Sequence, residues 1–326
     1  MIASRLFLAL TGLAALTGCR ADRGPDSALL ESREKEVKQR IESGSVSEEP
    51  LAKWILPDVL REVSGIAALD DGRIVAHNDE RARVYVIDPM RGVILKYFNL
   101  GKGGIVADFE AIAVSGADMY MLTSNGDVYQ FREGDDRATV EFTRHATNLG
   151  KECEFESLEI EAGTGAFIMP CKRVDKKSER NQVKIYRWLR QPGGAAAVSS
   201  ISVPLADAIG SNDWKELSPS DVAIDRRSGN YLIVTGPEKA LLEITPSGQV
   251  VRSMPVPGDP QQPEGIAITR DGVLIIADEG VARPADITMY SWQGLTGDTP
   301  PAPADTTAVP AASPVSNDSK IGDTSE

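Results

Sequence analysis

The chain has 326 residues, and 41% of them are hydrophobic, which is enough for one large domain or two with a buried core. Its formal net charge is −13, and because nucleic-acid phosphates are bound by basic surfaces, we expect no nucleic-acid partner. An acidic surface by itself indicates little beyond solubility.

The N-terminus predicts export. Arg5 precedes an apolar run from Leu6 to Leu16 that is too short for a stable membrane span. The run ends in Leu16-Thr17-Gly18-Cys19, which resembles the lipobox of bacterial lipoproteins, where cleavage precedes the cysteine and its thiol is then acylated. We therefore predict a lipoprotein signal peptide over residues 1–18, lipidation of Cys19 and an exported, lipid-anchored protein of the cell envelope. Arg20 follows, and by the sorting rule of that signal class a residue other than Asp indicates the outer membrane. The alternative is an ordinary signal peptide that contains a cysteine by coincidence.

Residues 19–50 are predicted to be a tether. The sequence from Ser27 to Ile41 favours a helix, with the pairs Glu34/Lys38 and Glu36/Arg40 at i,i+4 spacing. Leu30, Val37 and Ile41 are its only apolar residues on one side, so we expect a charged, solvated stalk and not a core helix.

From Leu51 onward the chain consists of repeated β-hairpins. The clearest copy joins two apolar strands, within 262–268 and 273–279, by the Asp271-Gly272 turn. Copies begin at residues 64, 110, 156, 220 and 264, at steps of 46, 46, 64 and 44 residues. A strand-rich period of about 40–50 residues is typical of a β-propeller with four strands per blade. We assign the surplus of the long step to the polar loop 173–182, so the prediction is five blades.

Two further strands follow each of the first four hairpins, and the fourth strand of the second repeat is predicted over Ala138–Phe142. The last repeat has only one further strand, Ile287–Trp292, and residues 294–326 are rich in Pro, Ala, Ser and Thr, which predicts a disordered tail. The missing strand comes from Leu51–Leu56. The predicted fold class is therefore all-β: a five-bladed β-propeller over residues 51–293, monomeric, with its ring closed by an N-terminal strand.

Acidic residues recur where the first strand of each hairpin begins and where the second ends. In antiparallel pairs these positions meet at the same mouth of the channel. The predicted metal ligands are Glu62, Asp79, Glu80, Asp108, Glu110, Glu156, Glu264, Asp278 and Glu279. Hard oxygen donors without His or Cys favour Ca²⁺. The alternative is that part of these side chains face solvent or cap neighbouring amides.

Cys153 and Cys171 flank the third hairpin, one entering it and one leaving it. This places them close enough for a disulfide, which an exported location permits. Two buried free thiols are the alternative.

Several motifs, taken together, resemble the SdiA-regulated family of bacterial envelope propellers. They are Leu60-x-Glu62-x-Ser64-Gly65-Ile66, Asn78-Asp79-Glu80, Asp108-Phe109-Glu110, Glu156-x-Leu158 with Cys171-Lys172, Pro219-Ser220-Asp221 and Gln262-Pro263-Glu264-Gly265. The resemblance covers about residues 54–292 and implies a five-bladed propeller, distantly akin to NHL-repeat proteins, with Ca²⁺ at a shared site. Ala111 departs from the pattern, since the family usually has Gly there.

Two function classes follow. The first is a non-enzymatic, calcium-binding, lipid-anchored module that presents a propeller face to another envelope protein. The alternative is a metal-dependent hydrolase of the lactonase or phosphoesterase type, with the channel metal as Lewis acid. The sequence has only two histidines, His77 and His145, and no Gly-x-Ser-x-Gly nucleophile motif, so we favour the binding module.

Overall fold

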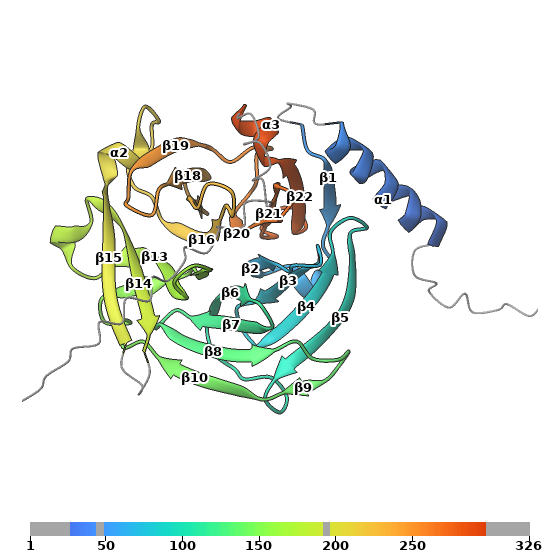
Figure 1. Ribbon diagram of the computed structural model, residues 1–326, viewed down its shortest axis with the longest axis horizontal. Coiled ribbons are helices and arrows are strands. Elements are labelled where there is room, and N and C mark those ends of the chain that lie inside the picture. Colours follow the sequence, from blue (N-terminus) through green and yellow to red (C-terminus); the bar gives the residue numbers. More distant parts are fainter. Residues whose placement is uncertain (1–26, 44–48, 192–195, 298–326) are drawn as a thin grey trace, which may run out of the picture.

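The computed structural model describes residues 27–43, 49–191 and 196–297. Five sheets surround a central channel, so the prediction of an all-β, five-bladed propeller is confirmed (Figure 1). The predicted signal peptide, the predicted lipidation site Cys19 and the chain beyond residue 297 lie outside the described residues. In the described ranges, no helix combines the length and the apolar character needed to cross a membrane.

Each blade is an antiparallel sheet whose strands follow one another outward from the channel. Blade 1 consists of β2 (Val63–Ala68), β3 (Ile74–Asn78), β4 (Arg83–Asp88) and β5 (Val93–Leu100). Blade 2 consists of β6 (Phe109–Ser115), β7 (Asp118–Thr123), β8 (Asp127–Arg132) and β10 (Phe142–Ala146). In blade 3, β11 (Cys153–Phe155) and β12 (Glu159–Glu161) both pair with β13 (Ala166–Val174), followed by β14 (Gln182–Arg190) and β15 (Ala196–Pro204). Blade 4 consists of β16 (Pro219–Ile224), β17 (Tyr231–Thr235), β18 (Ala240–Ile244) and β19 (Val250–Pro255). Blade 5 consists of β20 (Pro263–Ile268), β21 (Val273–Asp278), β22 (Asp286–Ser291) and β1 (Ala52–Ile55).

The core lies between neighbouring blades, in five clusters that each join two of them. Successive side chains of a strand point to opposite faces, so one strand serves two clusters. In β3, Ile74 and Ala76 pack with blade 5, whereas Val75 between them packs with blade 2. Both faces of every blade are therefore buried, which explains why the strands read as continuous apolar runs and not as alternating ones.

The Asp-Gly turns form hairpin connections as predicted. Gly72 and Gly272 have φ angles of +88° and +77°, a backbone conformation that glycine adopts without the steric penalty of a side chain.

An N-terminal strand closes the ring, as predicted. β1 pairs antiparallel with β22, with Ala52 opposite Met289 and Ile55 opposite Asp286. Backbone bonds from Leu51 and Leu56 extend this pairing at both ends. Closure in this way covers the edge that β22 would otherwise expose.

The outer strand of blade 2 and the origin of the long repeat step differ from the prediction. The fourth strand of blade 2 is Phe142–Ala146, whereas the segment predicted for it includes β9 (Thr139–Val140), which pairs parallel with β5 of blade 1. Val140 packs against the hydrophobic cluster between these two blades. Its apolar side chain is therefore explained by this packing and not by a place in the fourth strand of blade 2. The long repeat step arises from more than the polar loop: the helix α2 (Leu205–Ile209), packed between blades 3 and 4, adds to it.

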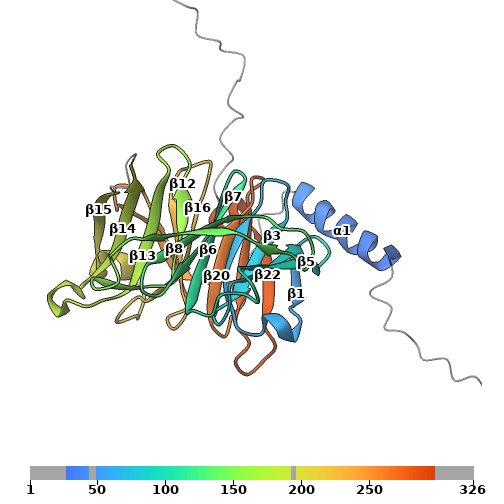
Figure 2. The ribbon, with the colours of Figure 1, turned by 90° about the horizontal axis from the view of Figure 1, so that it is seen from below.

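The prediction of a solvated stalk is wrong for one face of its helix. α1 (Ser27–Glu42) lies along the outside of the propeller beside β1 (Figures 1 and 2). Val37 is buried in the cluster between blades 1 and 5, and the Arg33 guanidinium lies 4.9 Å from the ring centre of Trp54 in β1. Glu34 pairs with Arg91 at 2.6 Å. At the other end, the helix α3 (Trp292–Thr296) packs Leu295 against the core, so the folded domain extends past the predicted boundary at residue 293.

Candidate functional site

A β-bulge occurs at the same place in every inner hairpin. The pairing register shifts by one residue near the start of each first strand, and the residue left without an opposite partner is Ser64, Glu110, Lys172, Ser220 or Glu264. In four blades this residue begins the sequence repeat, and in blade 3 it lies on the second strand. A bulge re-aims its side chain and increases the local twist, so the repeat places one polar side chain per blade at this end of the channel.

We call this end the acidic mouth and define it by Ser64, Glu110, Glu156, Lys172 and Glu264. The hydroxyl of Ser64 donates to Glu110 Oε2 at 3.4 Å, which joins blades 1 and 2. The Lys172 ammonium donates to Glu156 Oε1 within blade 3. The three carboxylates therefore come from blades 2, 3 and 5, and one ammonium lies among them.

Burial and mutual repulsion raise the pKa values of these carboxyls. The pKa of Glu110 rises to about 8, first through burial and then through the charges of Glu156 and Asp108. Burial and the charge of Glu156 likewise raise the pKa of Glu264 to about 8, although Lys172 opposes this. Burial also raises the pKa of Glu156 in spite of its bond to Lys172. Without a further cation, Glu110 and Glu264 would hold protons at neutral pH.

Lys172 is itself perturbed by the site. Burial lowers its pKa, but the hydrogen bond and the charge of Glu156 outweigh burial, so that the net shift is upward. The ammonium thus remains charged and partly neutralises the mouth. Lys172 is not among the predicted site residues, although it follows Cys171 at the exit of the third hairpin.

The remaining predicted metal ligands occupy three kinds of place. Glu62, Glu80 and Asp108 are exposed on the rim of the acidic mouth. Glu279 is half-buried, shares the amide of Gln262 with Glu264, and has its pKa raised by burial and by Asp79. Asp278 caps a loop instead, because its two oxygens accept from the backbone amides of Gln261 and Gln262 at 2.9 and 2.7 Å.

Two neighbouring oxygens are buried without a hydrogen-bond partner in the described structure. They are Asn78 Oδ1 and Asp79 Oδ1, at the end of β3. Burial also raises the pKa of Asp79, and the charges of Glu80 and Asp108 add to this. Buried acceptors are normally satisfied, and a bound cation is one way to satisfy them.

These donors fit Ca²⁺ in their chemistry, since carboxylate and amide oxygens are the ligands that this ion takes. In the ranges that the structure describes, no three acidic, histidine or cysteine side chains are already arranged to hold one ion. Cation binding would therefore require the flexible glutamate side chains of the mouth to reorient.

Asp221 lies deeper in the channel and holds the ring together. Its carboxylate accepts from the backbone amides of Val222 at 2.8 Å and Ile266 at 2.9 Å, and a further bond comes from the amide of Ile66. These amides belong to blades 4, 5 and 1. Burial raises the pKa of Asp221 well above its ordinary value.

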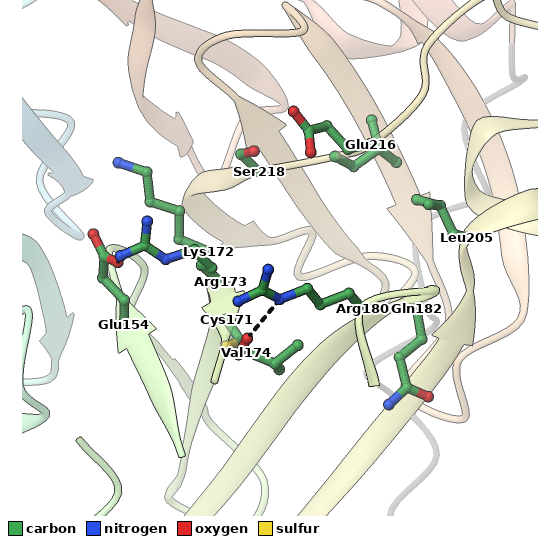
Figure 3. A pocket seen from close by; sticks show the side chains of 11 residues that line it. Glu154, Cys171, Lys172, Arg173, Val174, Arg180, Gln182, Leu205, Glu216 and Ser218 are labelled. Carbon is green, nitrogen blue, oxygen red and sulfur yellow. Dashed lines mark hydrogen bonds and ion pairs between the residues drawn. The ribbon is translucent and has the colours of Figure 1, made fainter. Parts of the chain in front are cut away.

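A cavity of about 360 Å³ adjoins the acidic mouth between blades 3 and 4 (Figure 3). Lys172 belongs to both. Arg173, paired with Glu154, lines the cavity, as do Arg180 and Ser218. Cys171 also lines it, and the structure joins this residue to Cys153 by a disulfide with a Cα–Cα distance of 5.8 Å. The disulfide therefore fixes the strand β13 that carries Lys172.

The two histidines lie in different surroundings. His77 is fully buried, its Nδ1 donates to the backbone oxygen of Asn78, and burial lowers its pKa to about 4. His145 lies on β10, the outermost strand of blade 2, with its Nε2 3.1 Å from Gln130 Oε1.

Comparison with known proteins supports the family resemblance. The sequence model of the SdiA-regulated family matches residues 211–301, which include strands β16 to β22, so the resemblance is confirmed for this part of the chain. No curated protein matches the chain.

Solved structures share the fold at low identity. A glutaminyl cyclase from Myxococcus xanthus is 12% identical, with a TM-score of 0.50 over 74% of this chain and 95% of that one. A protein of unknown function from Bacteroides thetaiotaomicron is 14% identical, with a TM-score of 0.42 over 72% of this chain, which spans 57% of that protein. The PQQ-bound aldose sugar dehydrogenase of Streptomyces coelicolor is 10% identical, with a TM-score of 0.47 over 73% of this chain and 97% of that one. At these identities the likeness concerns the fold alone.

Proposed function

We propose that this protein is a lipid-anchored β-propeller of the bacterial cell envelope that binds Ca²⁺ at the acidic mouth and serves as a binding module for another envelope protein. The observation that carries the proposal is the convergence of Glu110, Glu156 and Glu264, from three blades, around the ammonium of Lys172. Such a set of like charges is unfavourable unless some carboxyls are protonated or a cation is bound.

Calcium would be held by carboxylate oxygens of the acidic mouth and by neighbouring buried oxygens that accept no hydrogen bond within the described structure. Glu110 and Glu264 would supply charge, while the unpartnered oxygens of Asn78 and Asp79 lie on the blade 1 side. Asp108 is close enough to Glu110 to raise its pKa and could join them. When bound, the divalent charge would allow these carboxyls to ionise together.

The partner would meet the face that carries the acidic mouth. Glu62, Glu80 and Asp108 are exposed on its rim, so they would place negative charge around the proposed calcium site. A basic surface on an envelope protein would complement it, and calcium would neutralise the buried centre while leaving the rim charged. The cavity beside Lys172 would receive a side chain of such a partner.

Calcium binding is tested on metal-stripped protein by titration calorimetry and thermal unfolding. Calcium a hundredfold above its dissociation constant should stabilise the fold by about 2.7 kcal/mol. Mg²⁺ should act more weakly, because it dehydrates reluctantly and requires a tighter octahedron. Glu110→Gln should weaken calcium binding at least tenfold, whereas the control Glu141→Gln, at an exposed position on the edge of blade 2, should not. Unfolding that is indifferent to calcium and chelator would refute the proposal.

A further inference from the structure

A second axial cavity opens at the end of the channel opposite the acidic mouth. It has a volume of about 490 Å³, within the usual range for small-molecule sites, and forms where the inner strands end. Its walls are mainly apolar, with side chains from all five blades: Ala67, Val114, Ile160, Ile224, Ile266 and Ile268. It shares no lining residue with the acidic mouth.

One carboxylate in this cavity forms no ion pair with any residue that the structure describes. Asp70, at the rim, pairs with Arg226 at 2.7 Å and Arg270 at 3.4 Å. Glu161 pairs with Arg187 at 2.5 Å and also accepts from the hydroxyl of Tyr231. Glu159 differs from both, because its only hydrogen bond within the described part of the chain comes from the backbone amide of Ile160, at 2.7 Å, and no ion pair reaches it there.

The surroundings of Glu159 make its charge unfavourable. Burial raises its pKa to about 7, although the Ile160 amide and the charge of Arg226 both oppose the shift. Asp221 lies close enough in the channel for the charge of Glu159 to raise its pKa in turn. A carboxylate that is largely removed from water and forms no ion pair is stabilised by any cation that can approach it.

We propose that this cavity binds a small organic ammonium ion, with the ammonium group donating to Glu159 and the hydrocarbon body against the apolar walls. An anion is disfavoured, because Arg226 is already bound to Asp70 and because Glu159 and Glu161 also line the cavity. A neutral molecule of the same shape would gain the apolar contacts but leave Glu159 without a cation. The proposal is independent of calcium at the other end.

Three probes of similar shape test this inference by titration calorimetry with calcium present: 2-phenylethylammonium, 2-phenylethanol and 3-phenylpropionate. The ammonium should bind at least tenfold more tightly than the alcohol, and the carboxylate should bind most weakly. Glu159→Gln keeps the volume and removes the charge, so it should reduce ammonium affinity to that of the alcohol. The matched control Glu161→Gln should retain ammonium binding, because that carboxylate already has Arg187. Ala68→Leu narrows the cavity and should weaken ammonium and alcohol alike.

Three results would overturn the inference. The first is equal affinity for the three probes, or no binding of the ammonium at millimolar concentration. The second is unchanged ammonium binding in Glu159→Gln or in Ala68→Leu. The third is loss of ammonium binding in Glu264→Gln with retention in Glu159→Gln, which would place the amine at the acidic mouth. Thermal unfolding of each variant verifies that it is folded before titration.

Discussion

Lys172 and Glu156 form an ion pair at the acidic mouth, where carboxylates from three blades converge. The ammonium also lowers the pKa of Glu110 and of Glu264, so it acts on all three blades. The ammonium of Lys172 thus partly neutralises the same carboxylates that a bound metal ion would neutralise. The lysine therefore removes part of the repulsion among the three carboxylates.

Replacement of Lys172 by Met should therefore have two opposite effects. In chelator it should destabilise the fold, because Glu156 is left buried without its partner. The expected cost is about 2 kcal/mol, less than for a fully buried ion pair, because Lys172 is a third exposed and its charge is partly screened by solvent. In calcium the rise in melting temperature should be larger than in wild type, since a competing cation is gone. Thermal unfolding with and without calcium measures both effects. A calcium response smaller than that of wild type would show that Lys172 does not compete with the ion.

The pH dependence of stability provides a second test. Glu110 and Glu264 have folded-state pKa values of about 8, above their unfolded values, so the folded state binds more protons between these limits. Stability that is present at low pH is therefore lost as pH rises toward 8, by up to about 1.4 kcal/mol per pH unit for each group. Metal-stripped protein should be more stable at pH 6.5 than at pH 8.5. Saturating calcium should reduce the difference to the part that Glu159, whose pKa is raised to about 7, contributes at the other end of the channel.

Titration of His77 does not contribute to this difference between pH 6.5 and pH 8.5, because its folded-state pKa is about 4 and it affects stability only at lower pH. Glu110→Gln should reduce the slope of stability against pH in the metal-stripped protein, with the contribution of Glu264 remaining, whereas Glu141→Gln should leave the slope unchanged. A metal-stripped protein that gains stability between pH 6.5 and 8.5 would contradict the assigned direction of these shifts.

Ring closure by β1 is tested by truncation at the two ends. Removal of residues 1–56 deletes β1 together with the buried Leu51 and Leu56, and it exposes the edge of β22. This variant should unfold or associate through the free edge, as measured by circular dichroism and light scattering. Removal of residues 298–326 should leave the melting temperature within about 1 °C, because α3 and its packed Leu295 remain. Equal damage from both truncations would mean that β1 is not what closes the ring.

Much of the fold could be predicted from the sequence because the repeat begins at the bulge. In four blades the repeat start is the unpaired residue, so Glu110 and Glu264 were identified together with their shared mouth. Blade 3 breaks this pattern, since its bulge lies on the second strand at Lys172. A lysine after a cysteine carries no signal of that register, and the central cation of the mouth was therefore missed.

Other features depend on contacts that no local pattern encodes. The three apolar residues on one side of α1 are too few to predict a buried face, and the helix packs because Val37 reaches a cluster completed by blades 1 and 5. Likewise, Asp278 and Glu279 are adjacent in sequence, yet the first caps the amides of Gln261 and Gln262 while the second faces the mouth. Which of two neighbouring carboxylates points inward is determined by loop geometry.

The packing of α1 against the propeller limits how far a lipid anchor at Cys19 would let the domain lie from the membrane. Seven residues separate Cys19 from Ser27, so even a fully extended segment spans at most about 28 Å. Because α1 lies against the propeller and is no free stalk, lipidated Cys19 would hold the edge of blades 1 and 5 close to the bilayer.

Two or more acyl chains give stable attachment where one gives only reversible binding. Cys19→Ser should therefore move the protein from the membrane fraction to the soluble envelope fraction, with its melting temperature unchanged, since Cys19 precedes the folded domain. Cys153→Ser is the matched control: it removes the disulfide with Cys171, so it should lower stability but leave the protein in the membrane fraction. Wild-type protein that fractionates as soluble would rule out the anchor.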